Sequence, residues 1–138
     1  MTSFRCLTLT LAASLSLFAV GCGKPAMVPV QGTVTYRGYQ LNNGVIVFTP
    51  EQRGPLAIGR IREDGAFALY TGDNPGVYPG KYRVTISSLA PGASSESFGR
   101  FEFPRTAIPD KYRDPMQSNL GCEVLASRIN TFPVELTD

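Results

Sequence analysis

The fold class is decided by residues 56–70, LAIGRIREDGAFALY. The Asp64-Gly65 pair stands between two apolar-rich segments, and it is a strong signal for a tight turn because glycine adopts a positive φ without a Cβ clash. We therefore predict a β-hairpin around this turn. Phe67 and Leu69 lie two positions apart, so one face of the second strand carries both side chains toward the core.

Two further strands are predicted upstream. Residues 30–36 alternate apolar and polar side chains, which is the period of a strand with one buried face. Gly32 falls on the apolar side and indicates a bulge or a close approach of another backbone. Residues 45–48 form an unbroken β-branched and aromatic run, which predicts a central, well-buried strand that ends at Thr49-Pro50.

Three more strands are predicted downstream. Residues 81–86 alternate with the same period of two, and the segments 123–125 and 130–136 predict the last two strands. We expect Asn130 to hold a turn, because an asparagine side chain bonds readily to nearby backbone groups.

Turn signals recur at short intervals between these segments. No part of the chain after residue 27 shows an apolar period of 3.6 residues, and this combination is typical of an all-β protein. We predict one domain, residues 28–138, folded as an antiparallel immunoglobulin-like sandwich of about seven strands.

The first 21 residues have the layout of a secretory signal peptide. Arg5 precedes an uncharged apolar run, residues 7–20, that ends in small side chains. The run is shorter than the ~20 residues that a helix needs to span a bilayer, which favours a cleaved signal over a membrane-spanning helix.

The end of this segment, Ala19-Val20-Gly21-Cys22, resembles the lipobox of bacterial lipoproteins. The resemblance implies that Cys22 carries lipid and that the chain is cut in front of it; an ordinary signal peptide with a chance cysteine is the alternative. Residues 22–27 would then be a lipidated tether, and several acyl chains would hold it stably on a membrane. A tether of this length spans only about 20 Å, which keeps the domain close to the bilayer.

Charge and cysteine content exclude further classes. Loss of residues 1–21 removes one basic residue and no acidic one, which leaves 12 basic and 11 acidic residues. A formal charge of +1 gives no electrostatic footprint for nucleic acid. Cys6 leaves with the signal peptide and Cys22 carries the lipid, so Cys122 has no partner within the chain. We expect Cys122 to be a small buried residue rather than a reactive thiol.

The chain contains no histidine, so it lacks the commonest general base and the commonest zinc ligand. A Ser-His-Asp or Cys-His site cannot be built from it. Glu63-Asp64 lie in a tight turn, and Asp73-Asn74 lack the spacing of a calcium loop. We therefore predict that the protein is not an enzyme and has no catalytic residue, metal or cofactor.

Residues 87–107 do not continue the regular alternation of predicted strands and turns and form a long predicted loop. Long loops in compact domains are usually functional or disordered. Phe98, Phe101 and Phe103 are candidate contacts for a protein partner; a short edge strand or a cap over the core are the alternatives.

Two tyrosines, Tyr39 and Tyr78, lie in or beside predicted turns. Aromatic rings on the loops of a sandwich can stack on sugar rings, so both are candidate carbohydrate contacts. The alternative is that they close the ends of the sandwich and keep their hydroxyls in water.

Seven phrases occur in order along the chain: VQGTVTYRG at 30–38, GVIVFTP at 44–50, AIG at 57–59, EDGAF at 63–67, PGKYRVTI at 79–86, IPDKY at 108–112 and NTFPVEL at 130–136. Together they resemble the small bacterial lipoproteins with a transthyretin-like or carboxypeptidase-regulatory-like β-sandwich. The resemblance covers nearly all of the chain after residue 27 and implies an immunoglobulin-like sandwich. It supplies no catalytic residue, because such domains are usually accessory.

The main hypothesis is a lipid-anchored domain of the cell envelope, outside the cytoplasm, with a binding or structural role toward an envelope protein or polysaccharide. A carbohydrate-binding module that uses Tyr39 and Tyr78 is the first alternative. A transthyretin-like enzyme is the second, and the lack of histidine disfavours it. Gly23 follows the lipid cysteine in place of an inner-membrane aspartate, which favours the outer membrane.

Overall fold

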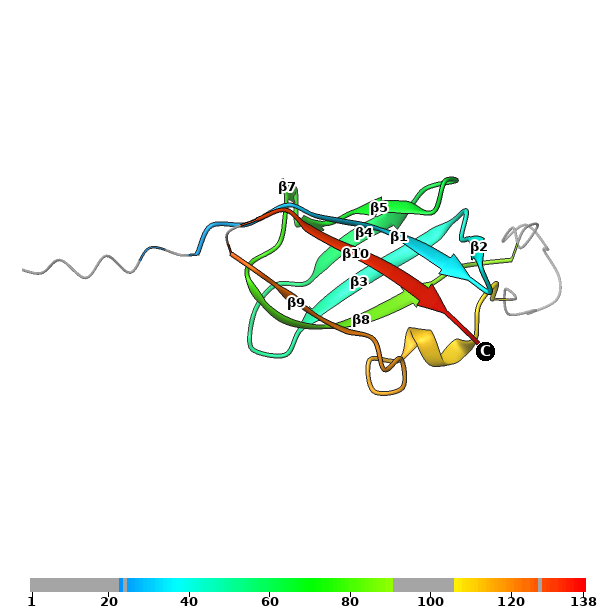
Figure 1. Cartoon of the computed structure of the whole chain (residues 1–138). Coiled ribbons are helices and arrows are strands. Elements are labelled where there is room, and N and C mark those ends of the chain that lie inside the picture. The colour runs from blue at the N-terminus through cyan, green and yellow to red at the C-terminus, as the bar shows by residue number, and fades with distance from the viewer. Residues whose placement is uncertain (1–22, 24, 91–105, 127) are drawn as a thin grey trace, which may run out of the picture.

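The computed structural model describes residues 23, 25–90, 106–126 and 128–138. In these residues the chain forms two β-sheets packed face to face, with no α-helix and one short 3₁₀-helix, η1 (Asp110–Arg113) (Figure 1). The predicted all-β sandwich is confirmed. Seven of the ten described strands have three residues or more.

The first sheet contains four strands: β10 (Asn130–Leu136), β1 (Val30–Tyr36), β2 (Tyr39–Gln40) and β5 (Ala66–Ala68). The second sheet contains six strands, in the order β7 (Asn74–Pro75), β6 (Tyr70–Thr71), β4 (Ala57–Ile61), β3 (Gly44–Pro50), β8 (Gly80–Ser87) and β9 (Gly121–Val124). Strands β1 and β10 run parallel, whereas the other paired strands are antiparallel. The predicted antiparallel arrangement is therefore wrong for this one pair. Parallel neighbours need a long connection, and most of the sandwich lies between these two strands in sequence.

The stretch 56–70 turns where predicted but does not form a hairpin. At the turn, Gly65 has a positive φ of 76°, and its amide donates a hydrogen bond to the Arg62 carbonyl at 2.9 Å. After the turn, β5 pairs with β1 in the opposite sheet, and β6 returns to pair with β4. The chain thus crosses between the sheets, and Phe67 and Leu69 still face the core, each 2 % exposed.

The crossing of β5 depends on Gly32 in β1. Gly32 is the register partner of both Phe67 and Phe132. A Cβ on Gly32 would lie 2.0 Å from the Phe132 carbonyl oxygen and 2.8 Å from the Phe67 ring. Of the two expectations for this glycine, close approach is therefore confirmed, because only a residue without a side chain leaves room for both neighbours.

Strand β3 is central, as predicted, but it is buried on one face only. Ile46 and Phe48 are fully buried, whereas Val45 is 38 % exposed. The strand also continues through Pro50, which pairs with Tyr82 of β8. The Glu51 amide donates to β8, so the ring nitrogen of the preceding Pro50 points to the opposite side of the strand. On that side β3 has no partner strand, because its pairing with β4 stops at Phe48. No ladder bond is lost there, and the proline is tolerated.

Phe48 joins the two sheets. Its ring centroid lies 5.9 Å from that of Tyr82 in its own sheet. In the opposite sheet, the rings of Phe67 and Phe132 lie 6.5 Å and 6.1 Å away. All three pairs are tilted, which is a favourable geometry for aromatic rings.

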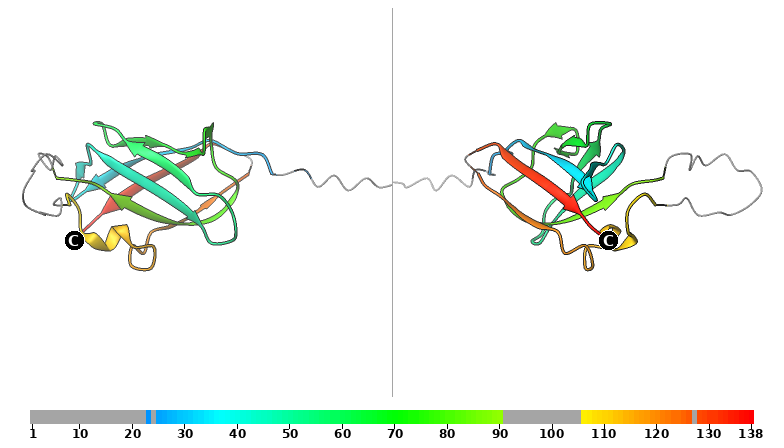
Figure 2. Two further views of the ribbon diagram at one scale, coloured as in Figure 1. Left: turned by 180° about the vertical axis from the view of Figure 1, so that it is seen from behind. Right: turned by 45° about the vertical axis from the view of Figure 1, so that its right-hand side comes forward.

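The two ends of the sandwich are distinct. Residues 25–28 enter at the end that carries β7, where the Val28 amide donates to the Val77 carbonyl at 2.9 Å. We call this the entry end. The C-terminus lies at the opposite end beside β2, as the views in Figure 2 also show. The seven residues of β1 separate the two ends by about 20 Å.

We predict that Phe48→Ala lowers the free energy of unfolding by about 3–5 kcal/mol, because it leaves a cavity between the sheets. Val47→Ala is the matched control, since Val47 is the adjacent residue on the outer face of the same strand. Its expected cost is under about 1 kcal/mol. Urea unfolding of both variants checks this, and equal losses would contradict the assignment of Phe48.

Candidate functional site

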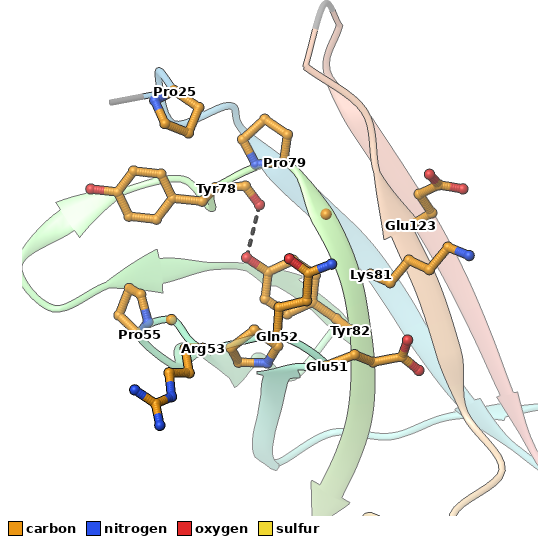
Figure 3. A pocket seen from close by; sticks show the side chains of 13 residues that line it. Pro25, Glu51, Gln52, Arg53, Pro55, Tyr78, Pro79, Lys81, Tyr82 and Glu123 are labelled. Atoms are coloured by element: carbon orange, nitrogen blue, oxygen red, sulfur yellow. Dashed lines mark hydrogen bonds between the residues drawn. The ribbon is translucent and has the colours of Figure 1, made fainter. Parts of the chain in front are cut away.

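A groove of about 860 Å³ opens at the entry end (Figure 3). We call it the entry groove. Its wall residues come from the end of β3, the following loop, the start of β8, β9 and the segment that enters the domain. They are Pro25, Pro50, Glu51, Gln52, Arg53, Gly54, Pro55, Tyr78, Pro79, Gly80, Lys81, Tyr82 and Glu123.

One wall of the groove is fixed by a tyrosine. Tyr82 is 4 % exposed, and its hydroxyl donates to the Tyr78 carbonyl at 2.8 Å. This bond from a strand tyrosine to the backbone four residues upstream is the tyrosine corner of β-sandwiches. Gly80, with φ 149°, lies between the two residues and lets the chain turn back on itself. Tyr78 itself is half-buried, and its backbone is held in place.

The opposite wall is the loop from residue 51 to residue 55. Its first residue is tied to β8, because the Glu51 amide donates to the Lys81 carbonyl at 3.0 Å. Pro50 and Pro55 bracket the loop and limit its backbone freedom. Gln52 and Arg53 are exposed and line the groove. The second wall is therefore tied to β8 at its first residue and has a proline at each end.

The charges around the groove balance. Arg53 and Lys81 are the lining cations, and Glu51 and Glu123 are the lining carboxylates. Lys81 and Glu123 are cross-strand register partners on β8 and β9. Outside the lining, the Arg83 guanidinium lies 3.9 Å from the Glu51 carboxylate. The groove therefore offers both donors and acceptors without a net charge of its own.

The structure does not bring the two candidate carbohydrate tyrosines together. Tyr78 lines the entry groove. Tyr39 is 79 % exposed in β2 and pairs with Tyr36 at the far end of β1. A separation of about 20 Å rules out one platform made of both rings. Cys22 and the candidate partner contacts Phe98, Phe101 and Phe103 lie outside the described residues.

Sequence reasoning missed the remaining lining residues. Gln52 and Arg53 stand in a short polar loop between two prolines, and that pattern could have marked a rigid, exposed turn. Glu123 could not have been found in this way, because it reaches the groove only through the pairing of β9 with β8.

A second surface shows exposed apolar side chains. On the outer face of the six-stranded sheet, Ile58 and Tyr70 are register partners and each is 48 % exposed. Val47 is the partner of Ile58 on the other side.

The far end is closed by an ionic cluster. The Arg37 guanidinium binds the Asp138 carboxylate through two nitrogens, and the Tyr36 hydroxyl donates to the same carboxylate. The hydrogen bond from Arg37, together with that from Tyr36, lowers the pKa of Asp138. The Tyr112 hydroxyl donates to the Thr137 carbonyl and accepts from its amide. These polar groups are paired with one another, so the cluster is structural.

Asn130 behaves as the sequence predicts. It is 5 % exposed, and its side-chain oxygen accepts from the Leu125 amide at 2.9 Å. Its side-chain nitrogen donates to the carbonyls of Leu125 and Arg128. The three bonds hold the connection between β9 and β10.

Cys122 is a free, partly buried thiol in the described part of the chain. It is the register partner of Tyr82 beneath the groove. Burial raises the pKa of the Cys122 thiol to about 12. Burial and the neighbouring thiol also raise the pKa of Tyr82. Cys122 is thus less buried than expected. Its raised pKa disfavours the thiolate, which is the nucleophilic form, so low reactivity stays a prediction.

Comparisons with known proteins returned nothing for this chain: no family model matches it, and neither the curated proteins nor the solved structures contain a match. The resemblance to transthyretin-like lipoproteins stays a prediction. Within the described ranges, no helix is long and apolar enough to cross a membrane. The same residues contain no group of three or more His, Cys, Asp or Glu placed to hold a metal ion.

We predict that Tyr82→Phe lowers the free energy of unfolding by about 1–2 kcal/mol, because the buried end of the ring loses its bond to the Tyr78 carbonyl. Tyr70→Phe is the control, since Tyr70 is half-exposed on the outer face. Thermal unfolding measures both changes. Equal stability of Tyr82→Phe and the unaltered protein would show that this bond does not hold the wall.

We predict that Cys122 reacts slowly with a disulfide reagent at about pH 8 and reacts fast once urea unfolds the chain, since its pKa then returns to about 8.5. The unfolded chain releases the thiol proton more readily than the folded one. Stability due to this group is therefore complete below about pH 8.5 and falls as pH rises toward 12. In the Cys122→Ser variant, this fall in the free energy of unfolding with rising pH should be absent. Urea titrations at several alkaline pH values measure it.

Proposed function

We propose that the protein is a lipid-anchored domain of the cell envelope that works by contact with a ligand or partner, and not by turnover. The observation that supports this proposal best is the position of the entry groove. It opens at the end of the sandwich where the chain arrives from Cys22, and Pro25 forms part of its wall.

The distance from the anchor to the groove is short. Cys22 and Pro25 are three residues apart, which corresponds to at most about 10 Å of extended chain. A lipid on Cys22 would therefore hold the entry end against the membrane surface. The ligands or partners within reach are those displayed close to that surface.

The side chains that are present support contact without turnover. The chain has no histidine to act as a general base near neutral pH. The Cys122 thiol is held in its neutral form by burial, and a neutral thiol is a poor nucleophile. The groove supplies hydrogen-bond donors, acceptors and the aromatic ring of Tyr78, which are binding groups.

We predict that Cys22→Ser moves the protein from the membrane fraction to the soluble fraction of its own cells. The physical reason is that the sulfur accepts the lipid, and a hydroxyl in its place leaves no acyl chain to bury. Cys122→Ser is the matched control and should remain in the membrane fraction. Fractionation with mass spectrometry of the amino terminus makes the measurement.

Two results would contradict the anchor. One is an unmodified amino terminus in the unaltered protein, at a position other than Cys22. The other is a Cys22→Ser variant that still carries acyl chains and stays on the membrane.

A further inference from the structure

We propose that the entry groove binds a neutral oligosaccharide, with one sugar ring stacked on Tyr78. This inference rests on the proposed contact function and names the class of ligand. The observation behind it is that one groove is lined by the half-buried Tyr78, by two cations with two carboxylates, and by both donors and acceptors of hydrogen bonds.

The groove has the size and rigidity of a ligand site. Its volume of about 860 Å³ falls within the usual range for ligand pockets, about 300–1,000 Å³. The bond from Tyr82 to the Tyr78 carbonyl holds one wall, and the bond from the Glu51 amide to the Lys81 carbonyl ties the first residue of the other wall to β8. A site that is already ordered loses little conformational entropy when a ligand binds.

The lining groups match the surface of a sugar. A pyranose ring has an apolar face of C–H bonds and an edge of hydroxyls, each of which both donates and accepts. Tyr78 supplies a ring, with Pro25 on one side and Pro55 on the other in Figure 3. The Gln52 amide can donate and accept on the opposite wall, where Arg53 adds further donors.

The charges favour a neutral chain. Lys81 lies between the strand that carries Glu123 and the loop that carries Glu51. The lining as a whole carries two cations and two carboxylates, so its formal charge is zero and gives no surplus of positive charge for a polyanion. The carboxylates instead accept hydrogen bonds from hydroxyls, which a sugar has in abundance.

A peptide bound by strand addition fits less well. That mode needs a free row of backbone amides and carbonyls at a sheet edge. Four of the lining residues are proline, namely Pro25, Pro50, Pro55 and Pro79, and proline has no amide hydrogen. The ring nitrogen of Pro50 takes the place of a donor at the open side of β3. A ligand in this groove would therefore be recognised mainly by side chains and not by backbone groups.

The test is calorimetric titration of the full-length protein in detergent with three neutral hexasaccharides: cellohexaose, maltohexaose and hexa-N-acetylchitohexaose. The acidic hexamer of galacturonic acid is the comparison. We expect saturable binding to at least one neutral hexasaccharide and weaker or no binding to the acidic one. Tyr78→Ala should weaken binding about tenfold or more through loss of the stacked ring. Tyr78→Phe keeps the ring and should bind within about twofold of the unaltered protein.

Tyr39→Ala is the matched control, because Tyr39 is an exposed ring at the far end of the same domain. It should bind as the unaltered protein does. Near-ultraviolet circular dichroism confirms that each variant is folded. The inference is overturned by the absence of binding to all three neutral chains at about 10 mM, well above a millimolar Kd. It is also overturned by preference for the acidic hexamer, or by equal losses in Tyr78→Ala and Tyr39→Ala.

Failure here is distinguishable from failure of the proposed function. Suppose that no neutral hexasaccharide binds, but Cys22 carries lipid and the domain cross-links to an envelope protein in its own cells. That result supports the contact function and contradicts the inference that the groove binds sugar. If Cys22 is unmodified and the protein is in the soluble fraction, the proposed lipid anchor is wrong, whatever the result of the sugar titration.

Discussion

The packing of Phe48 against rings from both sheets is the contact on which the rest of the structure depends. A sheet with one apolar face is stable only when that face is covered. Phe48 meets Tyr82 within its own sheet and Phe67 and Phe132 across the core. This one side chain therefore fixes how the two layers sit on each other, and the close approach at Gly32 makes room for the partner rings.

The core continues directly into the groove. Tyr82 packs its ring on Phe48 and directs its hydroxyl to the Tyr78 carbonyl, so one tyrosine belongs to both the core and the wall. A side chain with an apolar body and a polar tip is suited to this position. The position of Tyr78 thus depends on the packing of the two sheets, and a change in the core would be felt at the surface that we propose binds sugar.

The exposed edges of the sheets are interrupted. Pro133 lies within β10 at one edge of the first sheet, and Pro75 ends β7 at one edge of the second. Proline has no amide hydrogen to offer, and natural sheets use it at edges to prevent pairing with other chains. These two edges are poor sites for strand addition, which directs recognition to side chains on loops and outer faces.

The sequence by itself determined the all-β class, the turn at Gly65, the inward positions of Phe67 and Leu69, and the bonding role of Asn130. Each of these follows from local chemistry: a period of two, a residue without a Cβ, or an amide close to its backbone partners. Only the tertiary structure decided that β5 joins the opposite sheet and that β1 and β10 run parallel, because strand partners are chosen by packing between distant segments. The candidate site divides in the same way. Tyr78 was marked by its turn, but its separation from Tyr39 and its neighbours across the groove were set by which strands meet.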